Sequence, residues 1–164
     1  MKRTTCVDVI MGYLLAANLA SCGDHGTEPG YTTEPISEDH SAIADPYARW
    51  QAYNLTNYAI DQRVMCYCPN AGEIVGVYVR ENVVIDVIRS SDGRSILAEV
   101  PYLHKTVEEL FALTTSVHPD SVDSLVIQYD ERFGFPSFIY IDVDARAVDD
   151  EGSYLSQGLR RLLP

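Results

Sequence analysis

Apolar side chains recur at every second position over several short stretches of this chain, and this spacing constrains the fold more than any other feature. From Tyr58 to Cys66, every second residue falls on one face of an extended chain. The stretches EIVGVYVR and NVVIDVIRS follow, joined by a tight turn near Glu81-Asn82. Later, SLVIQYD and SFIYIDVD flank ERFGFP, in which Gly134 can supply a positive φ. The pattern predicts about five strands.

A different spacing, of three and four residues, predicts a first short helix. Asp45 is a favoured N-cap, and Pro46 is tolerated at the first helical position because its missing N–H is not required there. Tyr47, Trp50 and Tyr53 then form an aromatic stripe along one side of this helix. We interpret the stripe as core packing and not as a ligand cage.

The stretch KTVEELFALTTSV predicts the second helix. Thr106 with Glu109 three residues later is a capping-box pattern, and Val107, Leu110 and Phe111 form the buried stripe. The predicted order is therefore helix, three strands, helix, two strands. This order is typical of an α+β domain in which two helices cover mainly one face of an antiparallel sheet of about five strands.

The first residues of the chain predict an export signal. Lys2 and Arg3 precede an apolar run from Val9 to Ala20, which is shorter than a membrane-spanning helix requires. The run ends in LASC, which resembles the bacterial lipobox, where cleavage precedes the cysteine and its sulfur receives a diacylglycerol. An ordinary secretory signal is the alternative. We interpret residues 1–21 as a lipoprotein signal peptide and Cys22 as the lipidation site.

Composition divides the remaining chain into two parts. Residues 22–44 are rich in Gly, Pro, Thr, Ser, Glu and Asp without apolar periodicity, so we expect an acylated N-terminus and a flexible linker. Residues 45–164 form the predicted globular α+β domain. The net charge of −12 disfavours contact with phosphate backbones and excludes nucleic acid as an expected partner.

Several segments occur in an order that resembles a known family. These are Trp50 ahead of a tyrosine-containing strand, followed by CYCP, TVEELF, YDERFGFP and IDVDARAVDDEGSY. Together they resemble the bacterial envelope proteins of domain-of-unknown-function family 6174, over roughly residues 46–159. The resemblance implies a secreted, frequently lipidated domain without an assigned activity, so no catalytic residue is carried over.

Cys66 and Cys68 form the first candidate chemical site. Export places them in an oxidising compartment, and with Cys22 acylated they have only each other as partners within the processed chain. Residues two apart in a strand lie about 6.6 Å apart along its axis, so a disulfide needs a local bend. A structural disulfide, a redox or soft-metal site and two buried free thiols all remain open.

A group of carboxylates forms the second candidate site. Clustered carboxylates at the end of a strand could hold calcium, but the spacing fails the EF-hand pattern, with Ala147 and Ser153 at positions that require Gly and Glu. A solvated acidic loop, with one carboxylate paired to Arg146, is the alternative. The candidate residues are Asp142, Asp144, Asp149, Asp150 and Glu151.

Signatures of common enzymes are missing from the sequence, which has no nucleophile elbow, phosphate-binding loop or HExxH motif. His104 and His118 flank the second predicted helix, too far apart to share a metal, and are expected at the surface. We expect no cofactor. The predicted function is a lipid-anchored bacterial envelope protein that serves as a non-catalytic binding or structural module. Its expected partners are the membrane, through the lipid anchor, and an envelope protein. The alternative is a thiol redox or copper- or zinc-binding protein that uses Cys66 and Cys68.

Overall fold

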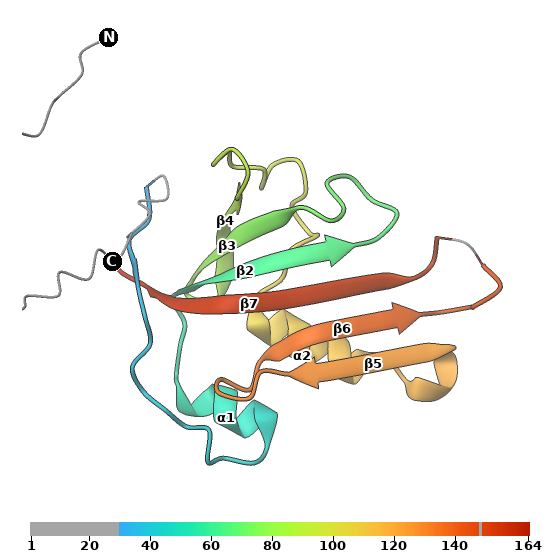
Figure 1. The fold of residues 1–164 in the computed structure, drawn as a ribbon, viewed down its shortest axis with the longest axis horizontal. Coiled ribbons are helices and arrows are strands. Elements are labelled where there is room, and N and C mark those ends of the chain that lie inside the picture. The colour runs from blue at the N-terminus through green and yellow to red at the C-terminus, as the bar shows by residue number, and fades with distance from the viewer. Residues whose placement is uncertain (1–29, 148) are drawn as a thin grey trace, which may run out of the picture.

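One twisted antiparallel sheet organises the part of the chain that the computed structural model describes, residues 30–147 and 149–164 (Figure 1). Its spatial order is β4-β3-β2-β7-β6-β5, with β1 paired to β7. The elements in chain order are β1 (Thr33–Glu34), α1 (Pro46–Ala52), β2 (Tyr58–Met65), β3 (Ile74–Arg80), β4 (Val83–Arg89), α2 (Val107–Ser116), the 3₁₀ turn η1 (Pro119–Ser121), β5 (Ser124–Tyr129), β6 (Pro136–Asp142) and β7 (Gly152–Leu162).

The sheet has seven strands, so the prediction of about five strands and the predicted element order are wrong. The two missed strands are β1, which is only two residues long, and β7, which lies between β2 and β6. Apolar alternation fails along β7 because Gly158 has φ +64° and the register against β2 shifts between Ala59 and Asp61. A bulge of this kind interrupts the period-two pattern that identified the other strands.

Residues 30–44 lie against the sheet and its loops, which differs from the flexible linker expected over residues 22–44. Ile36 is buried in the main core, and the Arg132 guanidinium donates to the backbone oxygens of Ile36, at 2.6 Å, and Glu38, at 3.2 Å. A single apolar residue carries no periodicity, so the sequence gives no sign of this contact. Residues 22–29, including Cys22, lie outside the described residues.

Both helices begin where the sequence predicts. The Asp45 carboxylate accepts from the Ala48 N–H at 2.7 Å, and Pro46 occupies the first turn of α1. Thr106 and Glu109 form the reciprocal capping box of α2, with distances of 3.1 and 2.7 Å. Neither these nor any other described helix is both long and apolar enough to cross a membrane.

Two tight turns also follow the prediction. Glu81 and Asn82 adopt φ values of 51° and 61° between β3 and β4. Gly134, between β5 and β6, has φ +84°, and a Cβ there would overlap the backbone oxygen of Pro46. Glycine at this position therefore allows the β5–β6 hairpin to approach the start of α1.

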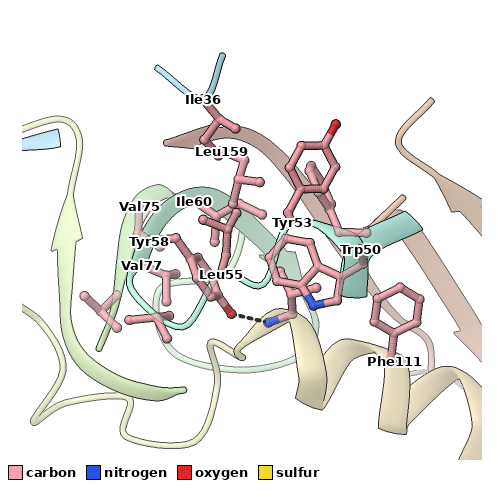
Figure 2. Packing of buried hydrophobic residues seen from close by; sticks show 14 of the residues in the cluster. Ile36, Trp50, Tyr53, Leu55, Tyr58, Ile60, Val75, Val77, Phe111 and Leu159 are labelled. Carbon is pink, nitrogen blue, oxygen red and sulfur yellow. Dashed lines mark hydrogen bonds between the residues drawn. The ribbon is translucent and has the colours of Figure 1, made fainter. Parts of the chain in front are cut away.

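The main core lies between the helices and one face of the sheet. Figure 2 shows Trp50 of α1 in this cluster, beside the Tyr58 ring, with the two ring centroids 5.5 Å apart. The Tyr58 hydroxyl accepts from the Val107 N–H at 2.8 Å, which links β2 to the first turn of α2. As predicted, Trp50, Val107, Leu110 and Phe111 are buried.

The opposite face of the sheet has a smaller apolar cluster. Tyr31 stacks on Tyr78 with centroids 4.4 Å apart, beside Ala59 of β2. Next to this cluster, Asp61 and Arg160 form an ion pair at 2.9 Å between β2 and β7. We call this the open face, because both helices lie on the other side.

Candidate functional site

An open groove of about 480 Å³ lies between the start of α1, the outer side of α2 and the end of β5. Tyr129, the last residue of β5, lines one part of it. We call it the α1–α2 groove. Its lining residues are Asp45, Pro46, Tyr47, Glu108, Phe111, Ala112, Thr114, Thr115 and Tyr129.

Three aromatic rings give the α1–α2 groove its apolar surface. Phe111 is buried, the Tyr47 ring meets it edge-on at 4.9 Å, and the Tyr129 ring stacks on it at 6.0 Å. Tyr47 is 48% exposed, so the prediction of a wholly buried aromatic stripe holds for Trp50 and Tyr53 but not for Tyr47. Helical spacing alone could not reveal that Tyr47 packs on Phe111 with half of its surface exposed.

Two carboxylates lie among these rings. Glu108 is held by both oxygens, one accepting from the Trp50 indole N–H and the other from the Tyr58 hydroxyl, each at 3.1 Å. Burial, followed by the nearby Glu108 charge, raises the pKa of Tyr58, so this hydroxyl stays protonated as a donor. Asp45, the N-cap of α1, is exposed at the rim.

The described residues that line the α1–α2 groove include no basic side chain. The partly buried Glu108 and the exposed Asp45 therefore line the groove without a neutralising cation beside them on its wall. A cationic head group on an apolar stem fits this surface, because aromatic faces attract cations and the carboxylates supply the opposite charge.

A second hollow, of about 330 Å³, lies at the opposite end of the sheet beside Cys66. The structure joins Cys66 and Cys68 in a disulfide with Cα atoms 5.2 Å apart, in the bend that follows β2. Tyr67 between them is 84% exposed. We call this hollow the disulfide pocket; Asp149 and Glu151 also line it, so the structure brings together parts of two groups that the sequence treated separately.

Two of the remaining calcium candidates, Asp144 and Asp150, contact nearby groups. Asp144 pairs with Arg146 at 2.9 Å, and its N–H donates to the Asp150 carboxylate at 2.8 Å. Desolvation, followed by the nearby charge of Asp150, raises the pKa of Asp142. Within the described ranges, no three His, Cys, Asp or Glu side chains converge as metal ligands.

The two histidines occupy different environments. His118 is exposed and lies 3.6 Å from the Asp120 carboxylate, whereas His104, expected at the surface, is only 6% exposed. Both ring nitrogens of His104 lack a hydrogen-bond partner among the described residues. Desolvation, with a smaller contribution from the Lys105 charge, lowers the pKa of His104 to about 4.

The described residues form a seven-stranded antiparallel sheet with two helices and an open groove lined by aromatic and acidic side chains. Residues 42–161 match the model of a family of unknown function, DUF6174, and the chain belongs to that family. No curated protein and no solved structure matches the chain. The family match includes both helices and every strand except β1, although it ends one residue before the end of β7.

Proposed function

We propose that this protein is a lipid-anchored, non-catalytic domain of the bacterial cell envelope that binds a cationic side chain of an envelope protein in the α1–α2 groove. The observation that carries the proposal is the lining of that groove. Three aromatic rings and two carboxylates meet there, and its described lining has no basic residue.

An arginine side chain fits this surface better than a neutral one. A planar guanidinium can stack on Tyr47 or Tyr129 while its N–H groups reach Glu108 or Asp45. The chain's net charge of −12 also favours the approach of a cationic partner. A single side chain supplies little buried area, so several such contacts are needed for tight binding.

Membrane attachment rests on Cys22 and the apolar run before it. Changing Cys22→Ser should abolish incorporation of labelled fatty acid and release the chain from the membrane fraction. The matched control is Cys6→Ser, because Cys6 precedes the proposed cleavage point. Continued acylation of the Cys22→Ser protein would contradict the anchor without bearing on the groove.

Binding in the groove can be measured by titrating the probe N-acetyl-arginine amide into the full chain in detergent and recording NMR shift changes. We expect a Kd of roughly 1 mM and shift changes centred on Tyr47 and Phe111. Asp45→Asn should weaken binding, because asparagine preserves the N-cap while removing the charge. Tyr47→Ala should do the same, whereas Tyr102→Ala is the matched control, since Tyr102 is exposed and does not line the groove.

N-acetyl-glutamine amide, a neutral probe with polar N–H groups, should give no saturable shifts at the groove. Equal binding of both probes, or arginine binding that neither Asp45→Asn nor Tyr47→Ala weakens, would contradict the proposal. The pair of variants also separates charge from aromatic stacking. A loss with Tyr47→Ala alone would indicate an apolar ligand instead.

A thiol redox function, or copper or zinc binding by the reduced pair, is a second candidate because Cys66 lines the disulfide pocket. An accessible disulfide that cycles readily would show a high reduction potential, whereas a structural one resists reduction by glutathione. Titration of free thiols across a glutathione redox series measures this directly. Two free thiols in protein isolated from the envelope would favour this second function.

A further inference from the structure

β5 presents a bare strand edge. Along the described chain, β5 pairs only with β6, so its other side has no neighbouring strand (Figure 1). Its sequence, SLVIQY, contains no charge and no proline, and Val126 is 41% exposed. Free edges are usually protected by charged residues, prolines or a covering segment, because their unpaired N–H and C=O groups attract other strands.

The opposite edge of the sheet shows such protection. The Ile96 N–H donates to the Val87 oxygen at 2.8 Å, and the Arg89 N–H donates to the Arg94 oxygen at 3.0 Å. Ser95 also forms a bridge with Ile88. The segment after β4 thus covers part of that edge, whereas no corresponding segment covers β5 among the described residues.

The bare edge leads directly into the α1–α2 groove. Tyr129, the last residue of β5, lines that groove and stacks on Phe111. A chain laid along β5 would run for about 20 Å over six residues and bring one of its ends to the groove. Carboxylates lie at both ends of this path. Asp123, which also accepts from the Ala145 N–H at 2.7 Å, comes just before β5, and Asp45 and Glu108 lie at the groove.

We propose that the partner is an extended polypeptide segment that adds to β5 as a strand and places a basic side chain in the α1–α2 groove. This inference rests on the proposed function and specifies the partner. Main-chain hydrogen bonds to β5 provide affinity, and apolar side chains on alternate positions contact Leu125 or Val126. A second basic residue at the far end of the segment meets Asp123.

A second copy of this chain is a poorer occupant of the same edge. If two β5 strands pair antiparallel with Ser124 opposite Tyr129, Asp123 of each copy lies opposite Asp130 of the other. Like charges placed opposite one another destabilise a strand pair, and this repulsion would occur at both ends. Charge complementarity therefore favours a different chain with basic ends.

The test uses a synthetic peptide of alternating valine and threonine with one arginine at each end, titrated into the full chain in detergent. We expect NMR shift changes along β5 as well as at the groove. A matched peptide with alternate N-methylated amides should bind about tenfold more weakly, because it keeps the side chains but loses main-chain donors. A peptide with glutamates in place of the terminal arginines should also bind about tenfold more weakly.

Val126→Lys is the corresponding change in the protein, with Val83→Lys as its control, because Val83 is exposed and begins β4 at the other edge. We expect Val126→Lys to weaken peptide binding about tenfold and to leave N-acetyl-arginine amide binding unchanged. Equal binding of the N-methylated peptide, or unchanged β5 shifts, would overturn strand addition. The groove proposal would survive that result, because it is tested separately with the arginine and glutamine probes and the Asp45→Asn and Tyr47→Ala variants.

Discussion

The two faces of the sheet are stabilised in different ways. On the helix-covered face, aromatic and branched side chains from β2, β3, α1 and α2 form one continuous buried cluster. On the open face, a small cluster around Tyr78 adjoins ion pairs such as Asp61–Arg160. Stability therefore depends mainly on apolar burial on one face and on a mixture of ring stacking and charge pairing on the other.

This difference predicts how strongly a substitution on each face should lower the free energy of unfolding. A side chain on the covered face contacts several elements, so its removal loosens helices and sheet together. On the open face Tyr78 is buried, but the Asp61–Arg160 pair remains partly exposed to water. Substitutions on the two faces should consequently differ in size and in their sensitivity to salt and pH.

Trp50→Ala should produce the largest effect, with a loss of about 3–5 kcal/mol in the free energy of unfolding. The indole is 3% exposed and donates to Glu108, so its loss creates a cavity and frees that carboxylate. Tyr31→Ala, on the open face, should cost about 1 kcal/mol because it removes mainly a stacking contact. Chemical denaturation measures both, and equal losses would contradict the distinction between the faces.

Acidification should weaken the fold through His104. The pKa of this buried group falls from 6.5 to about 4, so the unfolded chain binds a proton that the folded chain excludes between these pH values. The contribution of neutral His104 to the free energy of unfolding is fully present above pH 6.5. It is lost as the pH drops toward 4, by roughly 3 kcal/mol. The difference between wild type and His104→Leu, followed by denaturation across this range, isolates the effect from the carboxylates. A constant difference would contradict it.

The double change Cys66→Ser with Cys68→Ser should cost about 1.5 kcal/mol, because so short a loop restricts the unfolded chain little. The domain should still fold and still bind the arginine probe, since the disulfide lies at the far end of the sheet from the groove. Mass spectrometry of the unreduced wild type should show a mass about two daltons below that of the reduced chain. Loss of folding in the double variant would indicate a larger role for this bond.

Asp61→Asn should have the smallest effect, at most about 1 kcal/mol, because both side chains of the Asp61–Arg160 pair are partly exposed. The loss should shrink at high salt, which screens exposed charges. The Trp50→Ala loss should not shrink in the same way. A salt-independent loss for Asp61→Asn would show that this pair acts through geometry and not through charge.

The same contrast explains which elements could be predicted from the sequence. The helix-covered strand β2 can be predicted from the sequence because the buried side chains of Tyr58, Ile60, Gln62 and Val64 occupy every second position. The helix caps are also local signals, read within three residues of Asp45 and Thr106. These features need no knowledge of the rest of the chain.

The missed features depend on distant partners. β7 contains Gly158 and several polar residues, so it lacks apolar alternation. Its Arg160 donates to Asp61, which lies 99 residues earlier in the sequence. The groove needs Tyr47 and Tyr129, which meet Phe111 only after α1, α2 and β5 have come together. No spacing rule within one segment could have placed those three rings in one site.

The position of β7 also determines when the sheet can be completed. β7 is the last strand in the sequence, yet it joins β2 on one side to β6 on the other. The β2–β3–β4 and β5–β6 units can form early because their strands are neighbours in sequence, but only β7 unites them. Such non-local pairing slows folding. A chain that emerges N-terminus first therefore holds two separate half-sheets until β7 has emerged, and among the described strands only β7 can join them.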